Sequence, residues 1–364
     1  MNIAILGSRG IPNNYGGFEQ FTDVLSQKLV EKGHKVTVYC SDNHPYKEDN
    51  YNGVNLVHKF DPEDKIGTAG QFIYDLNCII HASKQKFDLI YLLGYTSSSV
   101  WQRLLQHKSE AVITNMDGLE WNRSKYSFIV RLFLKYAEKL AVKHSDLLIA
   151  DSVGIQSYLK NKYNILSTYI PYGSYIFNQP DKKYLVKYDL GPYLFDLLIS
   201  RFEPENNIEM VLDAYSKSKT NRKLLLIGDQ KHTKFGTRMF ELYNKNKRIL
   251  FLGHIYDQNI LNNFRFFSNL YFHGHSVGGT NPSLLEAMGA SALIAYHKNE
   301  FNEAVVGQDG FPFSDSKTLT RIIENSQKIN YPEYIENNLN KISTVYSWER
   351  ICDQYEEFFL QHIK

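Results

Sequence analysis

The amino-acid sequence predicts an α/β protein made of two doubly wound units, each built on a parallel sheet. The chain has 364 residues, which is more than a single hydrophobic core usually organises. Apolar residues make up 43% of it, enough for full globular cores. Strand-like runs alternate with helical patterns along the chain, and this alternation is typical of parallel sheets whose ligands bind at the carboxyl ends of strands.

The first half of the chain supplies one such unit. Strand patterns occupy residues 2–6, 35–39, 89–93, 111–115 and 147–150. Helical spacing predicts helices over residues 18–32, 97–106 and 126–143. Gly33 marks the turn between the first helix and the second strand. This order of elements predicts a parallel sheet with helices on its faces.

The second half repeats the pattern after the turn at residues 170–173. Strands are expected over residues 195–200, 223–227, 249–252 and 270–273, with a helix at 208–215. Residues 176–187 are largely polar and contain Pro180, so they are expected to form the linker. A last helix is expected over residues 347–363, where apolar residues recur at steps of three and four. We infer two similar halves that face each other across a cleft.

The bulk composition excludes several classes of protein. The 41 basic and 39 acidic residues give a net charge of +2, which argues against a general nucleic-acid binder. The three cysteines, Cys40, Cys78 and Cys352, are widely spaced, so neither a disulfide framework nor a zinc site is expected. The sequence opens on a strand and contains no apolar run of about 20 residues, so we expect a cytoplasmic protein without a signal peptide or a membrane span.

The segment from His273 to Gly289 is the most informative of the chain. Glycines and small hydroxyl residues follow a strand and precede a predicted helix, which leaves backbone N–H groups free to face an anion. Glu286 falls on the first turns of that helix, where its carboxylate is within reach of ribose hydroxyls. The segment therefore predicts a cradle for a nucleotide diphosphate. His273 and His275 either take part in catalysis or only fix the shape of the loop.

A second glycine-rich loop, residues 7–19, joins the first strand to the first helix. Its four glycines are Gly7, Gly10, Gly16 and Gly17. They allow a ligand to approach the backbone closely, and the helix that follows favours a negative group. The spacing is not a dinucleotide fingerprint, since Arg9 and Pro12 stand at two required glycine positions. The alternative is a connection without a ligand, although the sequence shows no packing need for four glycines.

Two further loops follow predicted strands. Asp117 lies after the strand at 111–115, where it can contact sugar hydroxyls or accept a proton, or simply cap a turn. Glu120 is a weaker candidate in the same loop, and Trp121 is a candidate for stacking on an acceptor sugar. Arg201 follows the strand at 195–200, where its planar guanidinium can clamp a diphosphate. The alternative for Arg201 is a surface ion pair with Glu203 or Glu205.

The predicted helix Tyr126–Lys143 carries a regular basic stripe. Its charged members stand four residues apart: Arg131, Lys135, Lys139 and Lys143. Aromatic and aliphatic residues lie beside the stripe, which suits contact with an anionic membrane surface. A solvated face on a packed helix is the alternative. No Asp-X-Asp pair or metal-spaced cluster is visible, so the sequence predicts a mechanism without a metal or other cofactor.

Together these segments resemble the family 4 glycosyltransferases, whose architecture of two Rossmann-like domains is called GT-B. The likeness is strongest to the bacterial rhamnosyltransferase-type subgroup, whose members share loops like residues 7–19, 117–121 and 274–286 in the same order. The turn Pro171-Tyr172-Gly173 and the late Ser347-Trp348-Glu349 also fit. The resemblance covers essentially the whole chain.

The resemblance implies retaining transfer of a hexose from a nucleotide-diphospho-sugar, dTDP- or UDP-linked, at the inner face of the cell membrane. The acceptor would be a lipid-linked oligosaccharide or a polysaccharide of the cell envelope. Residues 1–175 would bind the acceptor, and the terminal helix, residues 347–364, would cross back to pack on them. Residues 176–346 would bind the donor.

The resemblance also assigns roles to single residues. It makes Asp117, Arg201 and Glu286 the catalytic candidates, with Glu286 on the nucleotide ribose and Arg201 on the phosphates. The donor site would comprise Gly16, Gly17, Arg201, Gly279, Thr280, Asn281 and Glu286. The acceptor or transferred sugar would be contacted by Tyr15, Glu120, Trp121 and His275.

Two positions depart from the family pattern. Asn206 stands where the family often has a lysine, and Gly278 stands where it has the first acid of a Glu-x7-Glu pair. A deoxy donor such as rhamnose, which lacks the 6-hydroxyl, would account for the lost charges. The missing acid equally supports a non-catalytic sugar-nucleotide-binding protein. A third class is an NAD-dependent oxidoreductase in which Asp42 would bind the ribose. The broken glycine spacing argues against this class.

Overall fold

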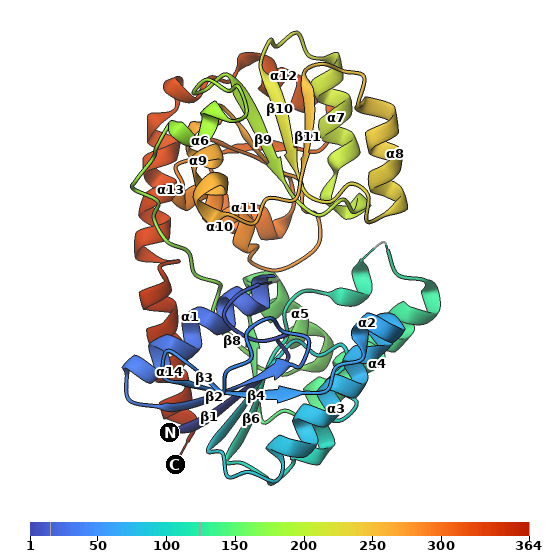
Figure 1. Ribbon diagram of the computed structural model, residues 1–364, viewed down its shortest axis with the longest axis vertical. Coiled ribbons are helices and arrows are strands. Elements are labelled where there is room, and N and C mark those ends of the chain that lie inside the picture. Colours follow the sequence, from blue (N-terminus) through green and yellow to red (C-terminus); the bar gives the residue numbers. More distant parts are fainter. Residues whose placement is uncertain (15, 124, 364) are drawn as a thin grey trace. The chain divides into compact units, whose positions relative to one another are not determined.

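The computed structural model describes residues 1–14, 16–123 and 125–363, and the chain divides into two compact units. Unit 1 comprises Met1–Asn122, Tyr126–Tyr172 and Trp348–Lys364. Unit 2 comprises Arg123–Lys125 and Gly173–Ser347. In Figure 1 each unit is a sheet covered by helices, as the sequence predicts.

Unit 1 is built on an eight-stranded sheet in the order β3-β4-β2-β1-β5-β6-β7-β8. All pairings are parallel except that of β3 with β4. The strands are β1 (Asn2–Leu6), β2 (Lys35–Ser41), β3 (Asn50–Tyr51), β4 (Val54–Lys59), β5 (Leu89–Leu93), β6 (Ala111–Asn115), β7 (Leu147–Ala150) and β8 (Thr168–Tyr169). The α-helices are α1 (Gly17–Glu31), α2 (Glu63–Ile66), α3 (Gly70–Ala82), α4 (Phe128–His144), α5 (Val153–Tyr163) and α14 (Trp348–His362). Short 3₁₀ helices are η1 (Gly67–Ala69), η2 (Gln102–Leu105) and η3 (Glu120–Asn122).

Unit 2 is built on a fully parallel six-stranded sheet in the order β11-β10-β9-β12-β13-β14. Its strands are β9 (Phe195–Ile199), β10 (Lys223–Ile227), β11 (Ile249–Gly253), β12 (Tyr271–His273), β13 (Ile294–His297) and β14 (Phe311–Phe313). Its α-helices are α6 (Lys183–Val186), α7 (Ile208–Lys217), α8 (Lys234–Tyr243), α9 (Gln258–Phe267), α10 (Pro282–Gly289), α11 (Glu300–Val306), α12 (Ser316–Asn325) and α13 (Pro332–Thr344). The 3₁₀ helices are η4 (Pro204–Asn206) and η5 (Lys328–Asn330).

The central strands are continuous apolar runs because helices cover both faces of each sheet. Every residue of β5 is buried, and so are the first four residues of β9. In unit 2 the core includes Leu226, Phe272 and Tyr215, with helices α7 and α12 packed against each other over it. These cores fix the positions of the strand ends, and therefore of the loops that follow them.

Helix α14 packs within unit 1 although it follows unit 2 in the sequence, which confirms the predicted return of the terminal helix. It lies against α1, where Phe21 contacts the rings of Trp348 and Tyr355. Tyr91 on β5 contacts Phe359 and donates a hydrogen bond from its hydroxyl to that of Tyr355 at 3.1 Å. The last helix therefore completes the hydrophobic core of the first unit.

Two sequence-based expectations about local structure are wrong. The helix expected over residues 97–106 is a series of turns ending in η2, because Ser97 and Ser98 turn their hydroxyls to Asp75 and to the Gly94 carbonyl. The linker expected over 176–187 belongs to unit 2 and contains α6. Its backbone is fixed there, with the Phe177 N–H on the Gly289 carbonyl.

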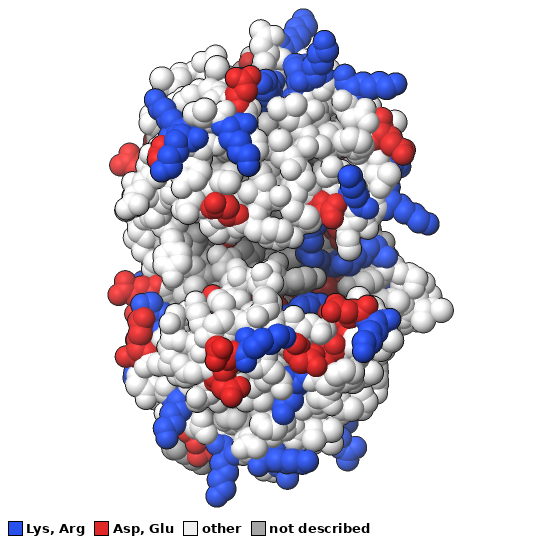
Figure 2. All heavy atoms as spheres, in the orientation of Figure 1, with Lys and Arg blue, Asp and Glu red and all other residues white. Residues whose placement is uncertain are grey.

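Charge is distributed without a dominant patch on the face shown in Figure 2, where basic and acidic side chains are interspersed over both units. This agrees with the net charge of +2. Within the described residues, no helix is both long and apolar enough to cross a membrane.

Candidate functional site

The candidate site in unit 2 lies at the point in the sheet where the order of the strands reverses. Strands β9 and β12 are neighbours, but β9 leads outward to β10 and β11, whereas β12 leads the other way to β13 and β14. Ligands of open α/β sheets bind outside the carboxyl ends of strands at such a switch point. The Ser200–Arg201 segment follows β9 and the glycine-rich loop 274–281 follows β12. The two strongest sequence motifs of unit 2 are therefore adjacent.

Hydrogen bonds join these two loops directly. The Glu205 carbonyl accepts bonds from both the N–H and the hydroxyl of Ser276, at 3.0 and 2.8 Å. The Asn207 side chain donates to the Gly274 carbonyl at 2.8 Å. A Cβ on Gly274 would come within 2.0 Å of the Asn206 carbonyl oxygen, so only glycine fits there. The loops act as one platform.

Asn206, which departs from the family lysine, has a structural role in this platform. It is buried, and its side-chain amide donates to the Arg201 carbonyl at 2.7 Å. The bond closes the turn that follows β9 and holds the backbone of the arginine.

Arg201 is exposed at the end of β9. Its guanidinium forms no ion pair with Glu203, Glu205 or any other carboxylate in the described part of the chain. The alternative of a surface ion pair is therefore not what the structure contains. A planar cation left open beside a glycine-rich loop is suited to bind phosphate oxygens.

The loop after β12 leads into the N-terminus of α10. Asn281 caps this helix, and its side-chain oxygen accepts a bond from the Ser283 N–H at 3.0 Å. Thr280 is buried and Gly279 is half-buried beside it. The side-chain oxygen of Asn281 is used for capping. The residue nevertheless lies next to the N-terminus of α10, where an anion is favoured.

Glu286 lies on α10 and is held by an arginine that the sequence analysis does not identify. Its carboxylate accepts a hydrogen bond from the Arg265 guanidinium at 2.5 Å. Arg265 is 1% exposed, whereas 17% of the Glu286 side chain is exposed. A second bond from Arg265 reaches the Asn262 side chain at 2.8 Å. The only sequence signal for Arg265 is a lone charge in the apolar run 264–267.

His273 and His275 form a stacked pair at the end of β12. Their ring centroids lie 4.4 Å apart with planes 14° from parallel. Burial lowers the pKa of His275 to about 3, with a further contribution from the positive charge of Arg201. Burial also lowers the pKa of His273 well below its usual range. Both rings are therefore neutral at physiological pH and cannot act as charged acids there.

Tight packing explains part of the glycine-rich loop in unit 1. Gly7 has a φ of +97°, and a Cβ there would lie 2.4 Å from the Leu93 carbonyl oxygen. Gly10 has a φ of +121°, and a Cβ there would meet the Cys40 side chain at 2.7 Å. The expectation that the glycines have no packing purpose is wrong for these two. Gly16 and Gly17 differ, since they form the cap and first turn of α1. Tyr15 lies outside the described residues.

The Asp117 loop follows β6, which neighbours β5 in the sheet. Asp117 has a φ of +39°, and its N–H donates to the Asn115 side chain at 2.9 Å. The Glu120 N–H donates to the Tyr95 hydroxyl at 3.3 Å. Both carboxyl side chains are half-buried at the carboxyl edge of the sheet, as the strand prediction requires. Their chemical roles stay predictions.

Trp121 is fixed by a buried carboxylate. Its indole N–H donates to Glu138 at 2.9 Å, and Glu138 also accepts bonds from Tyr158 at 2.9 Å and Lys162 at 2.8 Å. The Lys135 ammonium lies 4.6 Å from the centroid of the indole ring. Trp121 is therefore held as a rigid ring against α4 and α5. Stacking on a sugar stays a prediction, and a sugar would have to compete with the Lys135 ammonium for the face of the indole ring.

The described residues contain no group of three or more His, Cys, Asp or Glu side chains able to hold a metal ion. At Gly278, where the resemblance leads us to expect an acid, φ is +135° and a Cβ would meet no atom within 4 Å. The backbone here is therefore strained for other residues but sterically open.

The fold and the site define a class of protein with two α/β domains. In this class the loops that meet at the switch point of the second sheet form a platform of the kind that binds nucleotides. Residues 192–336 match the family model of the glycosyl transferases group 1, and residues 1–175 match a domain of unknown function, DUF1972. Residues 192–336 are therefore similar to the group 1 glycosyltransferases, and each of the two matches covers one part of the chain.

Two known proteins are similar to the chain. Protein CapJ of Staphylococcus aureus is 25% identical over 282 residues, which are 75% of this chain and 70% of CapJ. An uncharacterized 42.6 kDa protein in the cps region of Klebsiella pneumoniae is 26% identical over 196 residues, covering 45% of this chain and 51% of its own.

Solved structures confirm the predicted GT-B type of fold. Sucrose-phosphate synthase of Thermosynechococcus elongatus superposes with a TM-score of 0.78 at 17% identity, over 99% of this chain and 98% of its own. HepE of Anabaena, solved with UDP, gives a TM-score of 0.73 at 16% identity, over 99% of this chain and 100% of its own. At such identities the likeness shows the fold alone.

Proposed function

We propose that the chain transfers a hexose, with retention of configuration and without a metal ion, from a nucleotide-diphospho-sugar to a lipid-linked oligosaccharide or polysaccharide. The observation that carries the proposal is the joining of the Arg201 loop to the 274–281 loop at the switch point of unit 2. The capsule-related names of two relatives support the acceptor class. The structures of HepE with UDP and with UDP-glucose support the donor class.

The proposed donor site uses charges and backbone dipoles of unit 2. Glu286, oriented by Arg265, binds the ribose hydroxyls. Arg201 and the N–H groups of residues 278–281 bind the diphosphate at the N-terminus of α10. As the bond from the anomeric carbon to the phosphate oxygen breaks, negative charge grows on the leaving diphosphate. The fixed guanidinium and amide groups stabilise that charge.

The acceptor hydroxyl attacks the anomeric carbon from the side that the diphosphate leaves. Its oxygen forms the new glycosidic bond, and its proton passes to a phosphate oxygen of the leaving group. In this proposal Asp117 and Glu120 of unit 1 contact sugar hydroxyls, with Trp121 as a stacking surface. A neutral His275 contacts the transferred sugar as a hydrogen-bonding group, because its lowered pKa excludes the charged form.

We also propose that unit 1 rests on the inner face of the cell membrane through α4. The first turn of this helix presents Phe128 and Ile129, whose side chains are 74% and 78% exposed. The exposed lysines Lys135, Lys139 and Lys143 follow along the helix. Apolar residues beside ammonium groups suit the boundary between acyl chains and anionic headgroups. A Phe128→Ser, Ile129→Ser variant should lose co-sedimentation with anionic vesicles but keep nucleotide binding.

The test of the proposed function is a donor panel with a lipid-linked acceptor extract. The proposed donor is dTDP-L-rhamnose, so release of dTDP should exceed release of UDP from UDP-glucose. The reverse preference would refute the rhamnose assignment. Product formation should persist in EDTA, and its loss there would contradict the metal-independent mechanism.

A matched pair of arginine variants tests the site. Arg201→Ala should lower kcat/KM about a hundredfold or more, as removal of a transition-state donor does. Arg238→Ala removes the same charge from the surface of unit 2, where Arg238 pairs with Glu209, and should change little. Equal effects of the two variants would count against the proposed phosphate site.

One observation favours a second candidate, a sugar-nucleotide-binding protein without turnover. Gly278 supplies no acid where the family has one. Tight binding of dTDP or UDP, with no release of nucleotide from any donor in the panel, would support this candidate. Measurable turnover would exclude it.

A further inference from the structure

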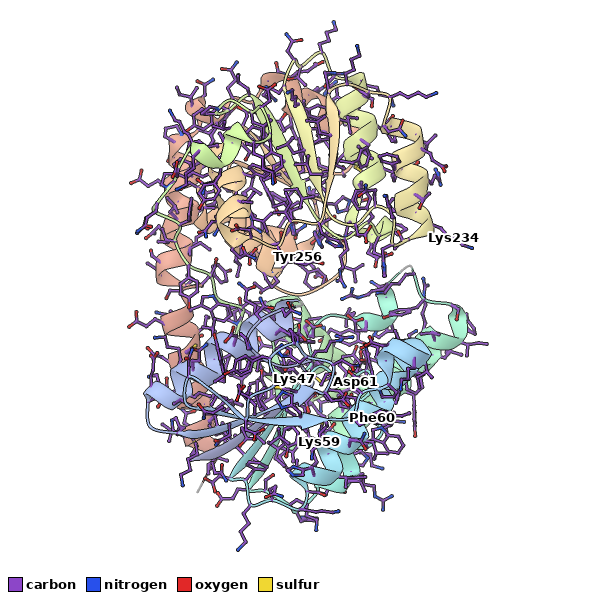
Figure 3. All side chains as sticks on the ribbon, in the orientation of Figure 1. Lys47, Lys59, Phe60, Asp61, Lys234 and Tyr256 are labelled. Atoms are coloured by element: carbon purple, nitrogen blue, oxygen red, sulfur yellow. The ribbon has the colours of Figure 1, made fainter. Side chains whose placement is uncertain are left out.

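A hollow in unit 1 gathers positive charge. It has a volume of about 410 Å³ and lies between the end of β4 and the helix α3. Figure 3 labels Lys59 and Phe60 on this side of unit 1. The side chains that line the hollow are Lys59, Phe60, Asn77, Ile80, His81 and Lys84.

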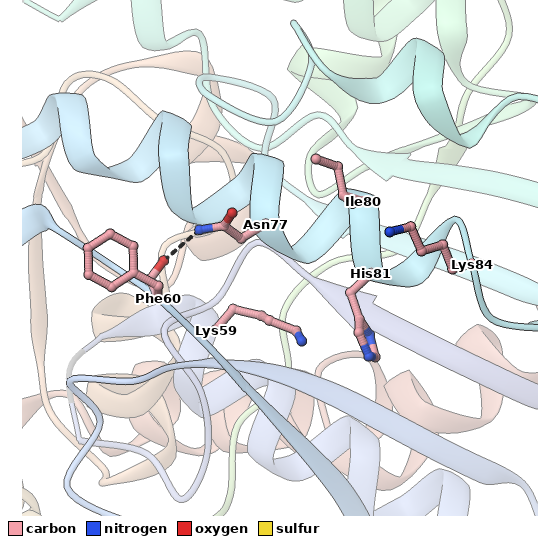
Figure 4. Close-up of a pocket in the computed structure, with 6 residues that line it drawn as sticks. All are labelled: Lys59, Phe60, Asn77, Ile80, His81 and Lys84. Carbon is pink, nitrogen blue, oxygen red and sulfur yellow. Dashed lines mark hydrogen bonds between the residues drawn. The ribbon is translucent and has the colours of Figure 1, made fainter.

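The cationic groups of the hollow come from two separate elements and converge. Lys59 ends β4, whereas His81 and Lys84 belong to the last turn of α3 and the residues after it. In Figure 4 the ammonium end of Lys59 is directed toward the His81 ring, and that of Lys84 lies on the side of Ile80. The pKa of His81 is lowered by burial and by the positive charges of Lys59 and Lys84.

No carboxylate compensates these charges. Among the described residues neither Lys59 nor Lys84 has an ion-pair partner, and no acidic side chain lines the hollow. The nearest acid in sequence, Asp61, is buried and accepts a bond from the Glu63 N–H at 3.0 Å. Cations at a helix C-terminus are favourable in any protein, so Lys84 alone would indicate nothing. Lys59 comes from a strand, so the charge of a helix C-terminus does not explain its position.

The imidazole adds a directed donor to the hollow. Nδ1 of His81 lies 3.0 Å from the hydroxyl of the buried Tyr39. When that hydroxyl donates to Nδ1, the ring proton is on Nε2 and available to an anion. Two ammonium groups and one imidazole then line the same hollow.

The rim of the hollow is apolar. Phe60 is 54% exposed although its backbone is fixed, since its carbonyl accepts a bond from the Asn77 side chain at 3.0 Å. Ile73 and Ile80 are exposed two turns apart on the same face of α3. Exposed aliphatic and aromatic groups beside cations match a ligand with a charged head and a hydrocarbon tail.

We infer that this hollow binds the phosphate group of an amphiphile, with Lys59, His81 and Lys84 on the phosphate and Phe60, Ile73 and Ile80 on the hydrocarbon chain. The source of the phosphate is either a membrane phospholipid or a single lipid-linked molecule. The inference does not rest on the proposed sugar transfer, because no residue of the nucleotide platform takes part in it.

Hexyl phosphate is the probe, since it carries the phosphate and a short tail as a dispersed molecule. Binding to the full chain is measured by calorimetry without nucleotide, with inorganic phosphate and hexanol as comparisons. Hexyl phosphate should bind, and each comparison should bind at least tenfold more weakly. Equal binding of inorganic phosphate would overturn the amphiphile assignment.

A matched pair of double variants locates the site. Lys59→Gln with Lys84→Gln should weaken hexyl phosphate binding about thirtyfold, at about 1 kcal/mol for each lysine. Lys35→Gln with Lys108→Gln makes the same change of charge at exposed positions of unit 1 outside the hollow, and should leave binding unchanged. Equal effects of the two pairs, or no effect of the first, would overturn the inference. UDP affinity should be unchanged in both, which separates this test from that of the nucleotide site.

Vesicles distinguish the two sources of phosphate. Phosphatidylcholine vesicles with and without phosphatidic acid are sedimented with the chain and with the Lys59, Lys84 double variant. Loss of the phosphatidic-acid dependence in the variant supports a membrane headgroup. An unchanged dependence, together with the loss of hexyl phosphate binding, supports a single lipid-linked ligand.

Discussion

A single buried arginine determines where the Glu286 carboxylate lies. The α10 backbone brings Glu286 to the edge of the platform, but its side chain would have several rotamers there. The bond from Arg265 at 2.5 Å selects one of them, and burial of Arg265 prevents the pair from separating into water. The carboxylate that we propose to bind the ribose thus obtains its orientation from the neighbouring helix α9.

Arg265→Lys should raise the Kd for UDP or dTDP about tenfold and lower the free energy of unfolding by about 3 kcal/mol, because a lysine cannot reproduce the guanidinium geometry. The matched control is Arg222→Lys, which alters another buried pair, with Asp196 at the opposite end of the unit 2 sheet. It should cost similar stability and leave nucleotide affinity unchanged. Nucleotide titration and urea unfolding check both, and unchanged affinity in Arg265→Lys would contradict the role given to Glu286.

The histidine pair makes the stability of the chain depend on pH. The pKa of His275 is about 3 in the folded protein, below the ordinary value of 6.5, so the unfolded chain binds more protons between these two values. Stability should therefore fall as pH drops below 6.5, by about 2 kcal/mol at pH 5 for this one histidine. Urea unfolding of the wild type and of His275→Gln between pH 5 and 7 measures the difference, and parallel profiles would refute the prediction.

At the scale of elements, the turn before α7 controls the platform of unit 2. Asn207 has a φ of +50° and donates its side-chain bond to the Gly274 carbonyl. Position 207 therefore has two requirements. Its backbone needs a positive φ, which glycine tolerates, and its side chain must make a hydrogen bond, which glycine cannot. Few residues other than asparagine meet both needs.

Asn207→Gly should lose only the hydrogen bond, at a cost of about 1 kcal/mol in the free energy of unfolding. Asn207→Ala should lose the same bond and also strain the backbone, for a total of about 2–3 kcal/mol. Both should weaken dTDP binding similarly, because both remove one of the hydrogen bonds that hold the 274–281 loop. Urea unfolding and dTDP titration measure the two effects, and wild-type affinity in Asn207→Gly would show that the loops position the nucleotide independently.

The sequence predicts elements best where a strand, a loop and a helix each carry their own local signal. Strand β9 ends in a polar loop and β12 ends in a glycine-rich loop, so both loops could be predicted from the sequence, although the hydrogen bonds that join them could not. The helix expected over 97–106 fails because serine hydroxyls compete for the backbone. Gly7 and Gly10 pack against segments more than 25 residues away, Leu93 and Cys40, so no local pattern reveals their purpose.

At the scale of the whole molecule, the order of the sequence and the order of the structure differ. The chain completes unit 2 at Ser347 and then returns to unit 1 with α14. Phe359 is fully buried against Tyr91, and Tyr355 lies beside it. The core of unit 1 is therefore incomplete until the last residues are made, whereas unit 2 is continuous from Gly173 apart from a three-residue segment.

Two compact cores predict two unfolding transitions with separate sensitivities. Phe359→Ala should lower the transition of unit 1, at about 3–5 kcal/mol for a buried aromatic residue, and leave that of unit 2 in place. Phe195→Ala, at an equally buried position of β9, should do the reverse. Saturating dTDP or UDP should raise only the transition that Phe195→Ala lowers, by about 2.7 kcal/mol at a hundredfold excess over Kd. Calorimetry resolves the two transitions. If the nucleotide instead raised the transition that Phe359→Ala lowers, the donor would bind to unit 1, and the platform at β9 and β12 would have another purpose.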